Sequence, residues 1–407
     1  MFALIVCVLL PRFELLTAAG DRSALLRGPV ALAPAPGSGS QEVGEVSAAA
    51  EAFGIEGGMR LGEALARCPQ LLLISPDPEG VADAWELVLS RLEGIGAAVA
   101  SERAGVAYFA AQGLVTLHGG TLERVIDAAR AVVGHPARIG AAATAFCALA
   151  AAVKARSRRA QVISGGSQGA RDYLAGLPVY LLRTRRATAI LVEPLERLGI
   201  ATLGELSALP RSALADRFGR AGLSAHDLAC GRDESLFVRL PAERLEESLE
   251  LEESASGQQL HYILGLLIDR LVARRERRGR TLRAVALSAV LVEGGTWREH
   301  VTFREALSDP IRMRLVLGSR LAKLPSPAQR LRIVVESFGP PVGDQRALLD
   351  ERGSSAERDG RLGEAVEQAR SAAGPDAALR VLTVDPQSRI PERRVVLAPY
   401  ERRRGTP

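Results

Sequence analysis

The chain of 407 residues is too long for a single hydrophobic core, because such cores rarely grow beyond about 250–300 residues, so several domains are expected. Hydrophobic residues make up 47% and charged residues 24%, values typical of globular proteins, which excludes a wholly disordered chain. A net charge of +5 suits a polyanionic partner but arginine-rich proteins reach it without one, and 4% aromatic residues argue against a surface that stacks bases.

Cysteine and histidine residues are too scattered to signal a metal or redox site. The four cysteines contain no CxxC pair, and the five histidines contain neither an HExxH motif nor an i, i+4 pair. We expect buried thiols in a reducing cytoplasm and isolated histidines. The sequence therefore predicts no resident metal and no cofactor. The residues concerned are Cys7, Cys68, Cys147, Cys230, His118, His135, His226, His261 and His300.

The first element in the chain is the apolar run MFALIVCVLLPRF, in which Pro11 ends the apolar stretch. A short apolar run stopped by proline is typical of a buried β-strand. A signal peptide or membrane span is the alternative, but no basic residue precedes the run, and it is shorter than the about 20 residues that a bilayer requires. We therefore expect a strand and no membrane association.

Strands and helices alternate in the next part of the sequence. A Gly/Pro/Ser-rich stretch with a short strand, GPVALAPAPGSGS, comes first, and EVSAAAEAFGIEGGMRLGEALARCPQ is helical apart from Gly57 and Gly58. The strand LLLISPD, the helix VADAWELVLSRLEGIG, two strands between Ala98 and Leu117, and the helix TLERVIDAARAVVG follow. This order predicts a mixed α/β or α+β unit.

A helical region is predicted next, behind a linker. The stretch QVISGGSQGA at 161–170 is rich in Gly and Ser and predicts the linker, after which helices run to near Arg232. In LERLGIATLGELSALP, Gly199 and Gly204 are predicted at turn positions between two short helices. Such a turn either aims backbone amides at a phosphate or simply packs two helices, and the pattern leaves both open.

The pattern changes again between residues 240 and 338. The helix QQLHYILGLLIDRLVARRERRG precedes the strand-like runs TLRAVALSAVLVEGG, WREHVTF and RLRIVVESF, which predicts a small α+β domain with an antiparallel sheet. The stretch 341–407 is rich in Gly, Pro and charge, with one predicted helix, one short strand and the basic end ERRRGTP.

Three segments, in this order, resemble the Y-family translesion DNA polymerases. EAFGIEGGMRLGEALARCPQLLLISPD is similar to their finger-to-palm passage, RIGAAATAFCALAAAVKAR to a palm strand and helix, and LERLGIATLGELSALP to their thumb. The resemblance implies an α+β, multidomain protein with the right-hand architecture of that family. It implies palm and fingers at 1–165 with the fingers at about 14–70, a helical thumb with a helix-hairpin-helix at 166–235, an α+β little finger at 240–340 and a C-terminal tail at 341–407.

The family's catalytic carboxylates have no counterpart in this alignment. Y-family polymerases resemble others in joining nucleotides with two divalent metals held by palm carboxylates. The aspartates of the first strand fall on Val8 and Leu10, and the adjacent aspartate and glutamate of the second motif fall on Gly105 and Val106. Glu102 is near, but in another register, and a shift of one residue turns a strand side chain to the opposite face.

The family's nucleotide pocket is altered as well. The tyrosine and arginine that hold the triphosphate correspond to Ala48 and Glu51, and an anion there repels a phosphate tail. Arg156 lies where the family has a phosphate-contacting lysine, so one basic group is retained, for a contact with the DNA duplex or as a surface residue.

The loss of these carboxylates resembles the pattern in the inactive ImuB-type subgroup of the family. The tail segment DPQSRIPERRVVLAPYERR is also similar to a segment found in that subgroup. The resemblance implies a non-catalytic hub in SOS mutagenesis and translesion synthesis in a bacterial cytoplasm. Its implied partners are damaged DNA, the sliding clamp, a RecA-like accessory protein of ImuA type and an error-prone C-family polymerase. Two alternatives stay open: an active polymerase that uses other acids, such as Glu14, Glu102 or Asp77, and a plain non-specific DNA-binding protein.

Two arginine-rich stretches are the predicted DNA contacts. The stretch ARRERRGRTLR lies in the little-finger-like region, which in the family touches backbone phosphates, and RTRRATA replaces the thumb's phosphate-clasping Gly-any-Gly. A solvated helix face is the alternative for the first stretch. The predicted contacts are Arg274, Arg275, Arg277, Arg278, Arg280 and Arg283, with Arg183, Arg185 and Arg186.

A partner motif is predicted in GDQRALLDER. Bacterial sliding-clamp ligands resemble Gln-Leu-any-Leu-Phe, and Gln345, Leu348 and Leu349 match that pattern in part. Arg346 replaces a leucine and Leu349 the phenylalanine. Because aromatic anchors dominate such interfaces, the match predicts weaker clamp binding than a full motif.

Overall fold

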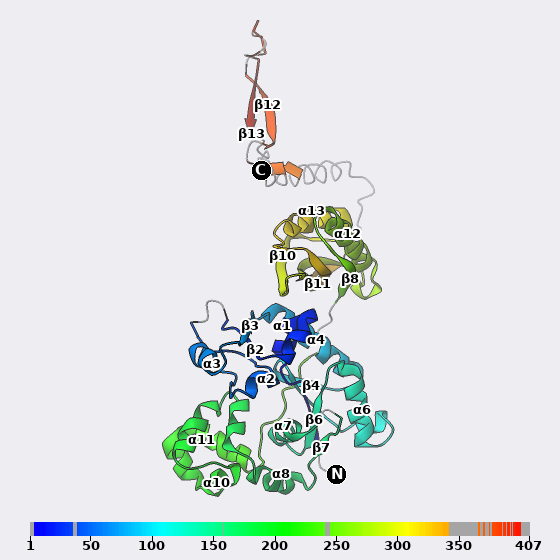
Figure 1. Cartoon of the computed structure of the whole chain (residues 1–407). Coiled ribbons are helices and arrows are strands. Elements are labelled where there is room, and N and C mark those ends of the chain that lie inside the picture. The colour runs from blue at the N-terminus through cyan, green and yellow to red at the C-terminus, as the bar shows by residue number, and fades with distance from the viewer. Residues whose placement is uncertain are drawn as a thin grey trace.

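The computed structural model shows an α+β protein with several separate sheets (Figure 1). It describes residues 4–35, 39–156, 158–240 and 245–341. Of the C-terminal segment it describes residues 365–366, 369–370, 374, 377–384, 386–387, 389–390, 392 and 394–399. In the described part of the chain, no helix combines the length and apolar character that crossing a bilayer requires.

The first unit is built on a five-stranded sheet of order β4-β5-β1-β6-β7. Strand β1 is antiparallel to both β5 and β6, and β7 is parallel to β6. The strands are β1 (Ile5–Leu9), β4 (Val99–Arg103), β5 (Val106–Ala110), β6 (Arg138–Ala142) and β7 (Gln161–Val162). The predicted opening strand is therefore confirmed, and it lies at the centre of the sheet.

Helices cover both faces of this sheet. Val6, Val8 and Phe109 pack with helices α4 (Pro78–Gly94) and α6 (Leu122–Val133) on one face. Cys7 and Tyr108 pack on the other face with α7 (Ala145–Lys154). Successive strand residues point to opposite faces, so a central strand buried on both sides must be apolar throughout.

A small α/β unit of the same chain lies beside α4. Strand β2 (Val30–Leu32) is parallel to β3 (Leu72–Ile74), and short helices surround this pair. The helices nearby in the chain are α1 (Phe13–Ala19), η1 (Gly20–Arg27), α2 (Ala48–Glu51), α3 (Leu61–Arg67) and, after β5, α5 (Leu114–Leu117).

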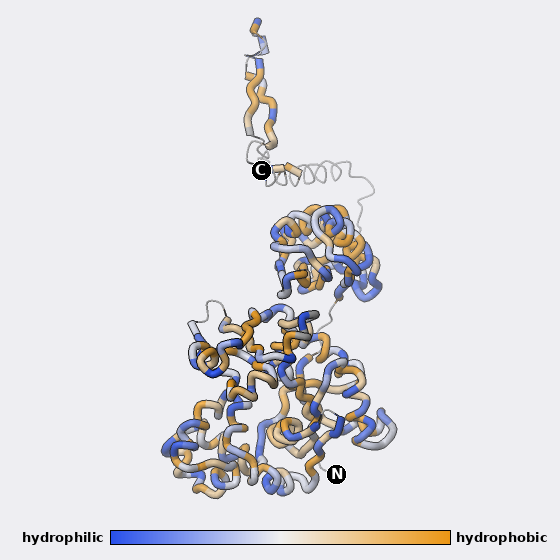
Figure 2. Tube along the Cα trace, viewed as in Figure 1, coloured by the Kyte–Doolittle hydropathy of each residue, from blue (hydrophilic) through white to orange (hydrophobic). Residues whose placement is uncertain are grey.

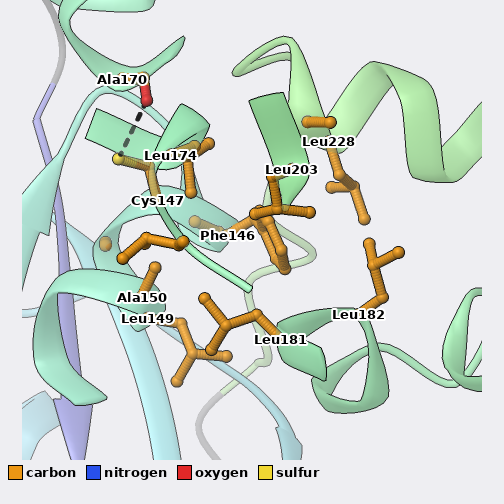
Figure 3. Packing of buried hydrophobic residues seen from close by; sticks show 14 of the residues in the cluster. Phe146, Cys147, Leu149, Ala150, Ala170, Leu174, Leu181, Leu182, Leu203 and Leu228 are labelled. Atoms are coloured by element: carbon orange, nitrogen blue, oxygen red, sulfur yellow. Dashed lines mark hydrogen bonds between the residues drawn. The ribbon is translucent and has the colours of Figure 1, made fainter. Parts of the chain in front are cut away.

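A helical unit continues the core that begins on α7. Figure 3 shows Phe146 and Leu149 of α7 in one apolar cluster with Leu174, Leu203 and Leu228. The elements of this unit are α8 (Gly166–Ala175), η2 (Val179–Thr184), η3 (Ala189–Leu191), α9 (Val192–Arg197), α10 (Leu203–Ala208) and α11 (Arg211–Ala229). Thr202 and Glu205 form a capping box that starts α10.

Two glycine predictions in this region are wrong. The expected linker at 161–170 instead contains β7 and the start of α8, and a Cβ on Gly169 would lie 1.8 Å from the Ser164 carbonyl oxygen. Gly199 is a turn residue with φ of 78°, but Gly204 lies inside α10, where a Cβ would meet the Ala175 carbonyl oxygen at 2.7 Å. These glycines permit close backbone contact rather than flexibility.

The third unit is a four-stranded antiparallel sheet of order β10-β9-β11-β8 with helices on one face. The antiparallel sheet agrees with the prediction, but β8 and α13 were not predicted. The elements are β8 (Glu246–Ala255), α12 (Gly257–Ala273), η4 (Arg275–Arg277), β9 (Arg280–Leu291), β10 (Thr296–Leu307), α13 (Pro310–Leu321) and β11 (Ala328–Pro341).

The described part of the tail contains a two-stranded hairpin. Strand β12 (Leu379–Thr383) is antiparallel to β13 (Val395–Pro399). The hairpin is largely apolar, as Figure 2 shows, yet Val381 and Leu397 are 62% and 63% exposed. The predicted strand at ALRVLTV is thus confirmed.

The four cysteines are free thiols, and all are buried, as expected. Cys7 and Cys147 belong to the cluster on α7, whereas Cys68 lies in the small α/β unit that contains β2. Burial raises the pKa of Cys147 to about 12.

Replacing Gly140 tests the close contact between β6 and α7. A Cβ at this position would lie 2.2 Å from the Ala148 carbonyl oxygen and 2.3 Å from the Ala152 nitrogen. Overpacking of this kind costs about 2–3 kcal/mol, so Gly140→Ala should lower the free energy of unfolding by that amount. Gly62→Ala is the control, because no atom lies within 4 Å of its Cβ site, and it should be neutral or slightly stabilising. Equal losses of stability in urea unfolding would contradict this packing.

Candidate functional site

The predicted positions of the lost carboxylates do not all share one face of the sheet. Val8 lies opposite Ala107, and Leu9 lies opposite Val106. Val8 and Leu10 pack on the α4 and α6 face, whereas Val106 packs on the α7 face. The pair Val8 and Val106 is therefore not brought together. The residue of β1 that faces Val106 is Leu9, one position away from the predicted one.

Gly105 lies in the turn between β4 and β5, with φ of 81°. Its carbonyl oxygen accepts a hydrogen bond from the Leu10 nitrogen at 2.8 Å. A Cβ here would come within 3.1 Å of the Leu10 carbonyl oxygen and 3.2 Å of the Phe13 Cβ. A side chain of any kind at this position, including a carboxylate, would be strained.

The face that carries Val106 is closed to water by an apolar cluster. Cys7 is fully buried, and Val106 and Tyr108 are each only 2% exposed. Burial raises the pKa of Cys7 and of Tyr108, so both side chains stay neutral. This face therefore presents no charged ligand of its own.

Arg185, which follows η2, lies over this closed face. Its guanidinium is 5.5 Å from the centre of the Tyr108 ring, donates to an Asp233 carboxylate oxygen at 3.1 Å, and pairs with Glu102. The side chain is only 12% exposed. Burial alone would lower the pKa of Arg185, but the carboxylates of Asp233 and Glu102 offset this effect and the pKa is raised.

Asp233 extends this ion pair to a third element, because its carboxylate also accepts from the Phe146 nitrogen at 2.7 Å. The group therefore joins the helical unit, β4, the start of α7 and the segment after α11. Two of the Arg185 donors are directed to carboxylates at a largely buried position, and DNA contact by Arg185 stays a prediction.

The other predicted cations near this unit are exposed. Arg183 lies over the Tyr180 ring at 4.9 Å, and Arg186 and Arg156 are also on the surface. Glu51, predicted to oppose a nucleotide, pairs with Arg12 at 2.6 Å, and Ala48 starts α2.

The six arginines around η4 divide into two groups. Arg274 donates to Glu247 at 2.5 Å, Arg280 lies 3.8 Å from the centre of the Phe338 ring, and Arg283 donates to the Arg304 carbonyl oxygen at 2.6 Å. Arg275 and Arg278 are exposed, and Arg277 is half-buried. Arg275 and Arg278 are thus the members of the stretch that are most open to a ligand.

Sequence reasoning missed three arginines that contact α4. Arg239 donates to Glu93 at 2.6 and 2.8 Å and to Glu86 at 2.7 Å, and these bonds raise its pKa. Its backbone nitrogen also donates to the Val99 carbonyl oxygen at 2.9 Å. Arg298 and Arg332 reach α4 from the four-stranded sheet. Their alternation with apolar residues along β10 and β11 was a signal that they share one sheet face.

Two further predictions concern ligands. In the described ranges, no three side chains of His, Cys, Asp or Glu gather closely enough to hold a metal ion. The predicted clamp residues Gln345, Leu348 and Leu349 lie outside the described residues.

Comparison with known proteins identifies the class of the first unit. Residues 13–153 match the model of the impB/mucB/samB family, the Y-family domain. The predicted resemblance to Y-family polymerases is therefore confirmed.

The similarity extends well beyond that domain. The chain is similar to Protein ImuB of Caulobacter vibrioides strain NA1000, with 28% identity over 351 residues that cover 84% of this chain and 74% of that protein. It is also similar to DNA polymerase IV of Dehalococcoides mccartyi strain CBDB1, with 27% identity over 252 residues, 60% of this chain and 63% of the relative. DNA polymerase IV of Ralstonia nicotianae shows 27% identity over 237 residues, 56% of this chain and 64% of the relative.

The Arg185 ion pair should contribute measurably to stability. Arg185→Ala leaves the largely buried Asp233 carboxylate without this cation, and breaking a buried pair costs about 3 kcal/mol. Urea unfolding should show that loss. The control is Arg197→Ala, which removes an exposed i, i+4 pair with Glu193 and should change stability by less than about 0.5 kcal/mol. If both variants unfold at the same urea concentration, Arg185 does not hold the units together.

Proposed function

We propose that this chain is a non-catalytic Y-family homologue that binds damaged DNA and acts as an adaptor in SOS-induced translesion synthesis. The observation that carries the proposal is the closed sheet face: Leu9 and Val106 lie opposite each other, and Arg185 with its carboxylates lies over the neighbouring Tyr108. Magnesium needs octahedral oxygen ligation with at least one carboxylate in most sites, and hydrocarbon side chains supply none.

The rival hypothesis is an active polymerase that uses Glu14, Glu102 or Asp77 as metal ligands. These three side chains have different contacts in the structure. Glu102 pairs with Arg185, and Asp77 caps α4 by accepting from the Gly80 nitrogen at 2.9 Å. Glu14 is exposed on α1. Because two-metal chemistry needs its carboxylates to converge on one point, this distribution favours the adaptor.

The proposal assigns the units of the fold to the parts of a Y-family polymerase. Residues 1–165 would be palm and fingers, 166–235 the thumb, 240–340 the little finger and 341–407 a partner-binding tail. DNA would be bound through backbone phosphates, without sequence readout and with strong salt dependence. The exposed cations Arg275, Arg278, Arg183, Arg186 and Arg156 are suited to such contacts, with Arg277 beside them.

The adaptor would work in a bacterial cytoplasm with protein partners. Gln345, Leu348 and Leu349 would bind the sliding clamp, and a RecA-like accessory protein and an error-prone C-family polymerase would join the assembly. The similarity to Protein ImuB supports this choice over a plain non-specific DNA-binding protein.

A primer-extension assay separates the adaptor from the polymerase. With Mg²⁺ or Mn²⁺ and all four nucleotides, the protein should bind a primed template at low salt but add no nucleotide, because Leu9 and Val106 offer the metals no oxygen ligand. DNA polymerase IV serves as the positive control. Extension that Glu102→Gln abolishes would establish the rival and end the proposal.

The clamp motif can be tested in both directions. Replacing Gln345, Leu348 and Leu349 by Ala should reduce capture of the protein by immobilised sliding clamp. The change Arg346→Leu with Leu349→Phe completes the motif and should increase capture about tenfold or more, since it adds an aromatic anchor. Capture that neither set of changes affects would remove the clamp from the list of partners.

A further inference from the structure

The four-stranded sheet has one face that α12 and α13 do not cover, and two arginines lie at its centre. Along β10 and β11, the residues on the α12 and α13 side are apolar ones such as Val301 and Ile333. Arg298 and Arg332 therefore point to the opposite face. Both pair with Ser288 of the intervening strand β9 in the sheet register, so they lie about 10 Å apart across a small residue.

Helix α4 covers these two arginines with carboxylates. Asp83 pairs with Arg298 through one oxygen and with an Arg332 guanidinium nitrogen at 3.1 Å through the other. Glu79 adds a second contact to Arg298 at 2.9 Å. The side chains of Arg298, Arg332 and Asp83 are only 15%, 14% and 17% exposed.

Further contacts flank this ion pair where the two units meet. Thr296 donates to Asp77 at 2.9 Å, and the tip of the β9–β10 hairpin at Gly294 lies against the Arg22 side chain. On the sheet itself, Glu246 accepts from Arg332, and Glu336 contacts His300 at 2.7 Å. An interface that rests on ion pairs weakens as salt or a competing anion is added.

A carboxylate that binds guanidinium groups through both oxygens presents them with two anionic acceptors, as a phosphate at the same place would. Arginine binds carboxylate and phosphate oxygens with the same donors, and phosphate accepts them at least as well. The small Ser288 between the arginines leaves room for a nucleic-acid backbone to approach the sheet.

We propose that α4 is an internal competitor of DNA: Asp83 and Glu79 occupy a site for a backbone phosphate formed by Arg298 and Arg332, and DNA binding displaces them. The inference rests on the proposed function, since it requires a DNA ligand. The described conformation is then the closed state, and the four-stranded unit must leave α4 to use this face. The apparent affinity for DNA is reduced by the fraction of molecules that are closed.

Removing the charge of Asp83 tests the competition. Asp83→Asn should lower the dissociation constant for a fluorescent primed template, measured by anisotropy at fixed salt, by about fivefold or more relative to the wild type. Asp127→Asn is the matched control, because it makes the same charge change and releases one surface arginine, Arg130, from an ion pair on α6. A gain of equal size in both variants would overturn the competition.

Two further measurements distinguish the separate parts of the inference. In the Asp83→Asn background, changing Arg298 and Arg332 to Gln should abolish the gain, because the released site is then gone. If the gain persists, these arginines are not the phosphate site. Small-angle X-ray scattering without DNA should show a larger radius of gyration for Asp83→Asn than for Asp127→Asn, and equal radii would show that Asp83 does not hold the units together.

DNA binding by the wild-type protein distinguishes failure of the proposed function from failure of the competition. A wild-type protein that binds no DNA at low salt would overturn both the proposed function and the phosphate site, whereas the scattering comparison still decides whether Asp83 closes the molecule. DNA binding by the wild type without any change in Asp83→Asn would overturn the internal competitor alone.

Discussion

The packing of the helical unit against the five-stranded sheet depends on a largely buried cation. Arg185 lies over the sheet face of Cys7, Val106 and Tyr108, and its two carboxylate partners come from β4 and from the segment after α11. An uncompensated guanidinium would be costly at this depth, so the helical unit, the sheet edge and the connecting segment must stay together for the charge to be balanced. The same contacts cover a face that would otherwise be open to solvent and ligands. Arg185 thus places a positive charge beside the sheet and joins these units through its two carboxylate partners.

Helix α4 connects the five-stranded sheet to the four-stranded unit, because its two sides differ in character. Trp85, Val88, Leu89 and Leu92 are buried against the five-stranded sheet. The opposite side carries Glu79, Asp83, Glu86 and Glu93, whose spacing of four, three and seven residues places them along one stripe. Arginines from two distant segments bind this stripe, Arg239 before the third unit and Arg298 and Arg332 within it. The helix is therefore a core element on one side and an electrostatic docking surface on the other.

The elements with strong local patterns could be predicted from the sequence, and the contacts between distant residues could not. The apolar run of β1 and the periodicity of α6 were sufficient, whereas α1 was missed because its seven residues follow Pro11 in a stretch that resembles a turn region. Strand β8 was missed although Leu249 and Leu251 alternate with glutamates, because its charge obscures the period of two. The site was predicted in its apolar character but not in its register, since pairing with β5 decides that Leu9 faces Val106. The pairing of Arg185 with Glu102 and Asp233 joins residues 83 and 48 positions apart, a separation that no local pattern reports.

Because all four cysteines are buried, their reaction with an alkylating reagent reports local opening of the structure. Thiols react as thiolates, and a thiol such as Cys147, shielded in the α7 cluster, forms almost none at neutral pH. Alkylation of each cysteine therefore requires the surrounding structure to open. The labelling rates then measure local opening of the fold rather than the intrinsic reactivity of the thiols. Because Cys7 lies beneath Arg185 and Cys68 lies in a different cluster, the two rates would report the motions of separate regions within one unmodified polypeptide.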